Sequence, residues 1–271
     1  MRLALSEIST VGASFEEDVA AYAAAGFDAI GIWEMKLPED EASNIGLLRE
    51  AGLSVANCIP AVPSILPLLL PGMEGPPDVA ERVDAIRASV HRLAAYEPES
   101  ILVITGPVGD LDPADAHLLV VEGLREIASA ARDAGVRLGL EPIHPGQDDT
   151  VSFVHTVADA LAVLDEAGLD DVGVMVDTYN LWHEDPAAIA AAAGRVTGLH
   201  VADEPTEPGR TDRVLPGESG AHTADVVRAL VAAGWDGSLD VEIFSTPDRF
   251  WGLPLDEAAR RAHSAAHALL P

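Results

Sequence analysis

Eight short apolar runs alternate with eight helix-like segments along this chain, and that alternation restricts the fold more than any other feature. The runs predict β-strands at residues 3–8, 29–33, 54–59, 101–105, 137–141, 173–177, 197–201 and 239–244. The segments between them predict helices at 15–24, 39–51, 77–95, 113–134, 156–167, 186–193, 223–233 and 255–270. Eight such units without a linker are typical of a closed parallel barrel. We therefore expect an α/β fold, a single (β/α)8 TIM barrel spanning residues 1–271 as one domain, with a doubly wound sheet as the alternative.

Glycines and prolines mark the ends of the predicted helices. Glycines suited to a helix C-terminus occur in the runs AAAGF, REAGL, RDAGV, DEAGL and VAAGW. Pro77, Pro113 and Pro186 lie where a first helical turn would begin.

Charge and cysteine content limit the classes of partner. The formal net charge is −29, which disfavours nucleic-acid backbones and anionic membrane surfaces because both require basic patches. Cys58 is the only cysteine, so no disulfide can form within the chain. The run MRLALSEIST lacks the apolar segment of a signal peptide, and the run SILPLLLPG is too short to span a bilayer. We expect a cytoplasmic protein that acts on a small molecule.

Four polar residues lie at the ends of four consecutive predicted strands, in the runs RLGLE, VGVMVD, VTGLH and SLDVE: Glu141, Asp177, His200 and Glu242. Strand side chains alternate between two faces, so these four share the face opposite to the aliphatic one. In a parallel barrel that face is the interior, and the strand C-terminal ends form the mouth where active sites lie. One polar residue at a strand end is usually a solvated loop residue, but four of matching parity indicate a common site.

This set of side chains suits one divalent metal ion. Three carboxylates and one imidazole favour Mn²⁺, Mg²⁺ or Co²⁺, with Zn²⁺ as an alternative. No cysteine ends these strands to favour a softer metal.

The segments LEPIHP, VDTYN, GLHVAD, DRVLPGE and DVEIF resemble the xylose isomerase-like TIM-barrel superfamily of sugar isomerases and epimerases. Within it, the chain is most similar to inosose isomerase-like proteins and ketose 3-epimerases, over nearly its whole length. The resemblance implies one metal ion held by Glu141, Asp177, His200 and Glu242. It also implies that Glu141 and Glu242 act as acid and base on opposite faces of the substrate.

Further residues are candidates for substrate binding. Arg213 matches the family's substrate-binding arginine, and His144 matches a histidine in the loop after the first ligand. Asn180 stands where many relatives have a histidine, and its amide can hydrogen-bond a hydroxyl but cannot titrate. Trp33 and Trp251 follow predicted strand ends, where an indole either packs against a sugar ring or fills the barrel rim.

The implied reaction is proton transfer through an enediolate that the metal ion stabilises, on a polyhydroxy ketone or aldehyde. Returning the proton to the opposite face epimerises the substrate, and returning it to the other carbon isomerises it. A lyase that dehydrates a keto-cyclitol uses the same chemistry and is the main alternative. A non-catalytic partner subunit is a weaker one, as is an endonuclease IV-type nuclease, which needs a histidine-rich three-metal cluster that the runs VANCIP and ILVITG do not supply.

One apolar loop and three single residues also deserve an expectation about their roles. Residues 60–77 form a long apolar loop that must be covered, either as a lid over the mouth or as a contact in a homo-oligomer. Lys36 is the only lysine and therefore the only candidate Schiff-base nucleophile. Asp203 is a candidate for orienting His200 or a nearby loop. Glu7 ends the first predicted strand with ambiguous parity and receives no role.

Overall fold

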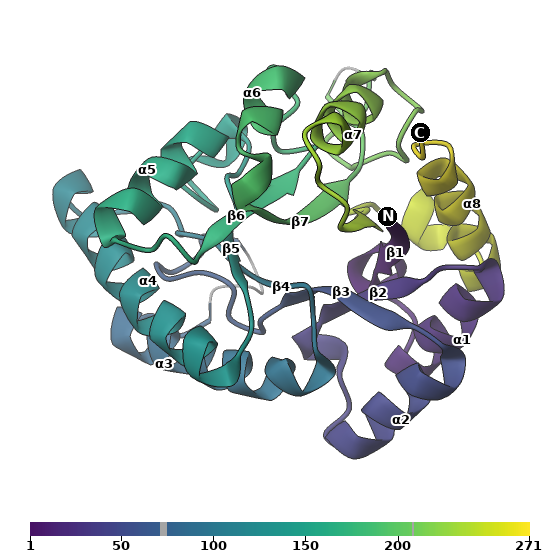
Figure 1. Ribbon diagram of the computed structural model, residues 1–271, viewed down its shortest axis with the longest axis horizontal. Coiled ribbons are helices and arrows are strands. Elements are labelled where there is room, and N and C mark those ends of the chain that lie inside the picture. The colour runs from purple at the N-terminus through teal and green to yellow at the C-terminus, as the bar shows by residue number, and fades with distance from the viewer. Residues whose placement is uncertain (71–74, 208) are drawn as a thin grey trace.

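The computed structural model describes residues 1–70, 75–207 and 209–271 (Figure 1). Parallel strands form one closed barrel in chain order, which confirms the predicted TIM barrel and excludes the doubly wound sheet. The strands are β1 (Arg2–Ser6), β2 (Ala29–Trp33), β3 (Ser54–Ile59), β4 (Ser100–Val103), β5 (Leu138–Leu140), β6 (Gly173–Asp177), β7 (Val196–Val201) and β8 (Ser238–Val241).

An α-helix follows each strand, and the helices form a ring around the barrel (Figure 1). They are α1 (Phe15–Ala25), α2 (Glu41–Ala51), α3 (Val79–Leu93), α4 (Pro113–Ala134), α5 (Val157–Ala167), α6 (Pro186–Ala191), α7 (His222–Ala232) and α8 (Leu255–His267). Glycines in the left-handed conformation follow α1, α2, α4 and α5, as the sequence predicts. Within the described ranges, no helix is both long and apolar enough to cross a membrane.

Two of the three prolines occupy the predicted positions. Pro113 and Pro186 begin α4 and α6. Pro77 lies outside α3, because the side chain of Asp78 caps this helix by accepting the backbone N–H of Glu81 at 3.0 Å. The capping carboxylate, rather than the proline, therefore sets the start of α3.

The aliphatic face of the strands packs against the helices. Leu140, Val176, Leu199 and Val241 are fully buried in the main core, which lies between the barrel wall and the helix ring. This packing turns the other face of each strand, which carries the polar residues, toward the barrel interior.

Strand register places three polar residues side by side. Asp177 on β6 pairs with His200 on β7, and His200 pairs with Asp240 on β8. Glu141 and Glu242 lie one residue beyond the ends of β5 and β8, and their N–H groups donate to the carbonyl oxygens of the neighbouring strands at 3.0 Å and 3.3 Å. The strand ladder therefore extends far enough to orient both glutamates.

Residues 60–70 of the apolar loop pack against the barrel through several buried side chains. Ile65 and Leu66 are fully buried in the main core. Leu68 is 1% exposed and joins a second apolar cluster inside the mouth, whereas Leu69 is 54% exposed. The remainder of the predicted lid or subunit contact includes residues 71–74, which lie outside the described residues.

Candidate metal centre

Three of the four predicted ligands come together at the mouth of the barrel. Glu141, Asp177 and His200 each offer one ligand atom, and these atoms lie within 4.8 Å of one another. All three side chains are buried, with Asp177 and His200 at 0% exposure. Such a cluster can hold a divalent ion through two carboxylates and an imidazole.

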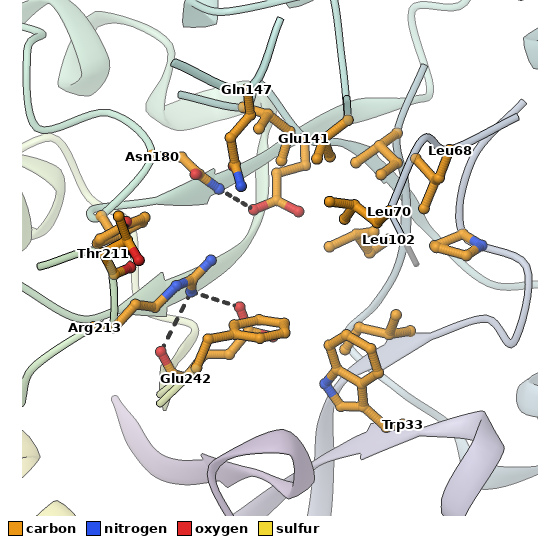
Figure 2. Close-up of a pocket in the computed structure, with 17 residues that line it drawn as sticks. Trp33, Leu68, Leu70, Leu102, Glu141, Gln147, Asn180, Thr211, Arg213 and Glu242 are labelled. Atoms are coloured by element: carbon orange, nitrogen blue, oxygen red, sulfur yellow. Dashed lines mark hydrogen bonds and ion pairs between the residues drawn. The ribbon is translucent and has the colours of Figure 1, made fainter. Parts of the chain in front are cut away.

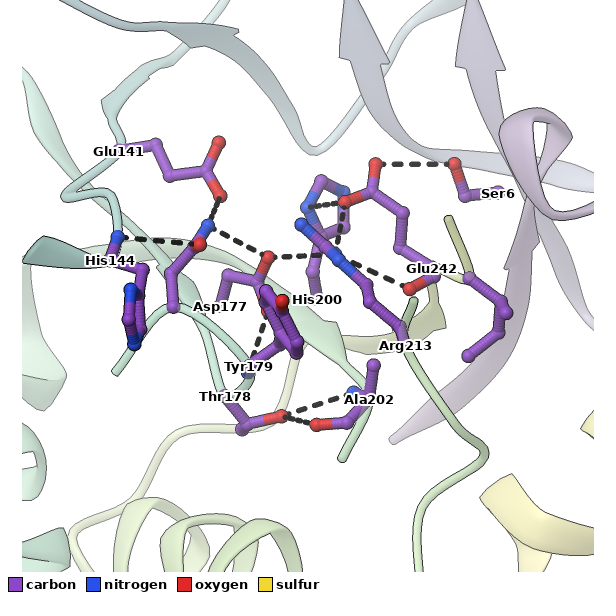
Figure 3. Close-up of polar contacts among 12 residues, drawn as sticks. Ser6, Glu141, His144, Asp177, Thr178, Tyr179, His200, Ala202, Arg213 and Glu242 are labelled. Carbon is purple, nitrogen blue, oxygen red and sulfur yellow. Dashed lines mark hydrogen bonds and ion pairs between the residues drawn. The ribbon is translucent and has the colours of Figure 1, made fainter. Parts of the chain in front are cut away.

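The fourth predicted ligand, Glu242, lies beside this cluster. Its Oε2 atom is 3.3 Å from Nδ1 of His200. Arg213 lies between Glu242 and Asp177, with Nη1 at 2.7 Å from Oε2 of Glu242 and 2.8 Å from Oδ2 of Asp177 (Figure 3). The guanidinium therefore bridges two of the predicted ligands.

Aromatic rings hold Arg213 in this position. Its guanidinium carbon lies 4.7 Å from the ring centroid of Tyr179 and 4.8 Å from that of Phe244. Two cation–π contacts on a buried arginine restrict its orientation toward the carboxylates. Neither ring was among the candidate residues, because only the loop conformations after β6 and β8 bring them to Arg213.

Asn180 connects the other pair of carboxylates. Its amide nitrogen donates to Oε1 of Glu141 and to Oδ2 of Asp177, both at 3.0 Å. Its amide oxygen accepts the backbone N–H of His144 at 3.4 Å. A histidine could not make all of these contacts at once, so the asparagine organises the ligand cluster instead of titrating in it.

The imidazole of His200 is available to bind a metal ion. Neither of its nitrogens has a hydrogen-bond partner among the residues that the structure describes. Burial lowers the pKa of His200 from 6.5 to about 4, although the charge of Asp177 acts in the opposite direction. The ring is therefore neutral at neutral pH, which is the form that a metal requires.

Burial raises the pKa of every carboxyl group in the cluster. The pKa of Glu141 lies well above 4.5 because the side chain is desolvated and because Asp177 and Glu242 are close. The pKa values of Asp177 and Glu242 are also raised by burial, against the opposing charge of Arg213. Burial alone would lower the pKa of Arg213, but Asp177 and Glu242 outweigh it and keep this pKa above its ordinary value.

The charges of the site fit one divalent cation. Glu141, Asp177 and Glu242 carry three negative charges when they are ionised, and Arg213 neutralises one of them. The two remaining charges match one doubly charged ion. The donor set, its charge and the neutral imidazole of His200 all fit the implied metal.

A cavity of about 210 Å³ opens next to the cluster. Figure 2 shows two different walls: Asn180, Thr211, Arg213 and Glu242 lie on one side, and Trp33, Leu68, Leu70 and Leu102 lie on the other. Further apolar side chains line the cavity, namely Ile59, Ile104, Ile143, Val151 and Phe244. Glu141 and Gln147 lie at the boundary of the two walls (Figure 2).

The candidate substrate-binding residues differ in their positions. Arg213, Asn180 and Trp33 line the cavity. Trp251 lines a separate hollow against α1 and α8, and its indole N–H donates to backbone oxygens, so it seals the barrel rim. His144 stacks on Trp182 with the ring centroids 5.8 Å apart, away from the cavity lining.

The amine of Lys36 is held by hydrogen bonds within the protein. Its amine donates to the carboxylate of Asp18 and, at 3.1 Å, to the carbonyl oxygens of Glu7 and Thr10. The residues that line the cavity do not include it, so the structure does not support a Schiff-base role. Glu7 is buried in the same network, and its Oε2 atom accepts the backbone N–H of Trp33 at 2.9 Å.

Two aspartates near His200 differ in role. Asp203 accepts hydrogen bonds from Gly217, Ser219 and Thr223, so it organises the loop before α7. Asp240 lies inside the barrel and approaches Nε2 of His200 at 3.7 Å. The sequence shows that Asp240 and Glu242 are two residues apart and therefore point to the same face of their strand. A shared face alone does not indicate a contact between Asp240 and His200.

Comparisons with known proteins identify distant relatives of this chain. An L-ribulose 3-epimerase of Mesorhizobium japonicum is 29% identical over 126 residues, which cover 45% of this chain and 39% of the epimerase. A 3-dehydroshikimate dehydratase of Pseudomonas aeruginosa is 24% identical over 261 residues, which cover 90% of this chain and 38% of the dehydratase. The chain therefore spans less than half the length of these curated relatives.

A solved structure and a family model cover almost the whole chain. The crystal structure of the IolI protein with a bound zinc atom matches with a TM-score of 0.81 and 18% identity, over 99% of this chain and 98% of that one. At this identity the match supports the fold alone. The model of the xylose isomerase-like TIM barrel family matches residues 19–267, so the chain belongs to that family.

Proposed function

We propose that this protein is a metal-dependent isomerase or epimerase of a sugar or keto-cyclitol. The observation that carries the proposal is the buried cluster of Glu141, Asp177 and His200, with Glu242 beside it, at the mouth of a barrel from this family. Distant relatives include sugar epimerases, which favours the same class of reaction.

In the proposed mechanism, Glu141 and Glu242 transfer the proton. Both line the cavity, and they come from β5 and β8, on different sides of the barrel (Figure 2). One carboxylate removes a proton from the carbon between a carbonyl and a hydroxyl group, and the other returns a proton to the opposite face. Glu141, Asp177, His200 and Glu242 would hold a divalent ion, which would supply electrostatic stabilisation for the negative charge that develops on oxygen.

The neighbouring polar residues orient the substrate and the carboxylates. Arg213 carries a fixed positive charge at the cavity wall and donates hydrogen bonds toward substrate oxygens. Asn180 holds Glu141 and Asp177 through its amide nitrogen, so both carboxylates keep a defined direction. Because Asn180 cannot titrate, the proton transfer depends on the two glutamates.

The donor set favours Mn²⁺, Mg²⁺ or Co²⁺, since three of the four proposed ligands are carboxylates. Zn²⁺ is an alternative, and the IolI structure with bound zinc supports it for this fold.

The apolar wall of the cavity favours a substrate with an apolar face. Leu68, Leu70 and Leu102 lie opposite the polar wall, and an open-chain polyol would leave its hydroxyl groups without partners there. A carbocyclic ring presents C–H groups to such a wall. This feature, together with the dehydratase relative that covers 90% of the chain, favours dehydration of a ring as the second candidate function.

The experiment combines metal analysis with a substrate screen in heavy water. Chelation should abolish turnover of keto-sugars or inososes, and Mn²⁺ or Co²⁺ should restore it. The product should carry deuterium on the carbon beside the carbonyl, whereas a dehydratase would give a conjugated product that absorbs ultraviolet light. Conversion without deuterium incorporation and without water loss would contradict both functions.

The matched variants are Glu242→Gln and Glu204→Gln. Glu242→Gln keeps the shape of the side chain but removes a base and a ligand charge, so it should lose turnover by a factor of about 100 or more. Glu204 lies in the loop after β7 and does not line the cavity, so Glu204→Gln should retain activity. Equal activity of the two variants would exclude Glu242 from the mechanism.

A further inference from the structure

A buried carboxylate that the proposed reaction does not use lies directly beside His200. Asp240 on β8 pairs in register with His200 on β7 and is 0% exposed. Its Oδ2 atom lies 3.7 Å from Nε2 of His200. Its Oδ1 atom has no hydrogen-bond partner within the described part of the chain.

The barrel interior is shaped to contain this carboxylate. A β-carbon at Gly31 would overlap the carboxylate of Asp240, and a β-carbon at Gly198 would overlap the amide of Asn57. Asn57 donates to Oδ2 of Asp240 at 3.1 Å. Two glycines therefore make room for a polar pair from β3 and β8.

Packing alone does not explain Asp240. One neutral amide is a weak partner for a buried carboxylate, and a buried charge without good compensation destabilises the folded state. An apolar residue would fill the same interior at lower cost. The carboxylate therefore has a use apart from stability.

The two nitrogens of His200 face different groups. Nδ1 lies 3.3 Å from Glu242 in the ligand cluster, and Nε2 faces Asp240. A histidine that binds a metal through one nitrogen usually donates the N–H of the other to a carboxylate, a carbonyl or water. The distance of 3.7 Å exceeds hydrogen-bond range by about half an ångström, which a small side-chain rotation can close.

We propose that Asp240 is a positioning residue that accepts the Nε2–H of His200, so that Nδ1 presents its lone pair to the metal ion. The inference rests on the proposed metal centre and deepens it. By accepting this hydrogen bond, Asp240 selects the tautomer that carries its proton on Nε2 and fixes the orientation of the ring. The competing explanation is that Asp240 serves only as the partner of Asn57 inside the barrel.

The test measures the affinity of the metal-free full-length protein for Co²⁺, by competition with a chromophoric chelator. Asp240→Ala removes the acceptor, and Asp240→Asn keeps the size and one weaker acceptor. We expect a loss of roughly 10–100-fold for Asp240→Ala and a smaller loss for Asp240→Asn. The measurement needs no substrate, so it does not depend on which reaction the protein catalyses.

The matched control is Ser100→Ala. Ser100 donates to Thr197 at 3.0 Å inside the same barrel, so this variant removes a buried polar contact at a position that does not adjoin His200. Its Co²⁺ affinity should stay within about twofold of the parent. If Ser100→Ala lost as much Co²⁺ affinity as Asp240→Ala, the loss would reflect a general disturbance of the barrel interior, and the proposal would be overturned.

Urea unfolding of the metal-free variants separates the two explanations. The midpoint of Asp240→Asn should be unchanged or higher, because the amide keeps the size of the side chain and cannot ionise inside the barrel. A lower urea midpoint of Asp240→Asn with unchanged Co²⁺ affinity would mean that Asp240 only stabilises the fold, and would overturn the proposal. If Asp240→Ala does not fold, the affinity of Asp240→Asn decides, and a value equal to the parent's overturns it. A parent protein that binds no Co²⁺ would instead overturn the metal centre itself.

Discussion

Replacing Glu7 with glutamine should stabilise the protein, and the gain should grow with pH. Glu7 is fully buried at the end of β1, and burial raises its pKa from 4.5 to about 8. Lys36 opposes this shift, but its amine lies 4.0 Å from Oε1 of Glu7 and contacts Asp18 more closely. Glutamine keeps the oxygen that accepts the N–H of Trp33 and removes the charge.

The direction of the pH dependence follows from the raised pKa of Glu7. The stability associated with Glu7 is fully present below its unfolded-state pKa of 4.5 and is lost as the pH rises through about 8. Each pKa unit corresponds to about 1.4 kcal/mol, so the loss reaches about 3 kcal/mol at pH 7 and about 5 kcal/mol above pH 8.

The assay is urea unfolding of the metal-free parent and of Glu7→Gln from pH 5 to pH 9. The difference in unfolding free energy should be small at pH 5, rise by about 1.3 kcal/mol per pH unit and level off above pH 8. Glu16→Gln, at an exposed position on α1, is the control and should show no such rise. A difference for Glu7→Gln that stays flat within about 0.5 kcal/mol would mean that Glu7 is ionised throughout, and would refute the reasoning.

Two other predictions concern Arg213 and the loop after β3. Arg213→Met should lower the unfolding free energy of the metal-free protein by about 3–5 kcal/mol, because Asp177 and Glu242 lose their buried partner. Saturating Mn²⁺ should recover part of this loss in urea titrations, and an unchanged stability without metal would contradict the bridging role. Leu68→Ser should destabilise by about 2–5 kcal/mol, whereas Leu69→Ser should change the stability by less than about 0.5 kcal/mol. A lower mass of Leu69→Ser by light scattering would assign the exposed leucine to a subunit contact.

The barrel could be predicted from the sequence because its signals are local. Strand parity and helix-ending glycines repeat in most of the units, and each needs only neighbouring residues to be recognised. The boundaries were less predictable. The first strand ends at Ser6 and not at residue 8, since Glu7 begins a 3-10 turn that buries its carboxylate near Lys36. That contact joins residues 29 positions apart, so no local pattern reveals it.

Strand parity could predict candidate site residues only on a strand or directly after one. Asp177 and His200 follow from parity, and register then places them side by side. Arg213 comes from a loop, and its bridge between Asp177 and Glu242 depends on tertiary contacts that no local pattern reveals. Trp251 also follows a strand end, but its indole N–H donates to backbone oxygens. It does not line the cavity.

The close fit inside the barrel also makes the effects of mutations depend on their order. Any side chain at Gly31 overlaps the carboxylate of Asp240, so this position is closed while the aspartate is present. Shortening Asp240 first opens the space, and the same substitution at Gly31 then loses its steric penalty. The two changes are therefore strongly non-additive. A laboratory evolution experiment that selects single substitutions would find Gly31 invariant, although the pair can vary together.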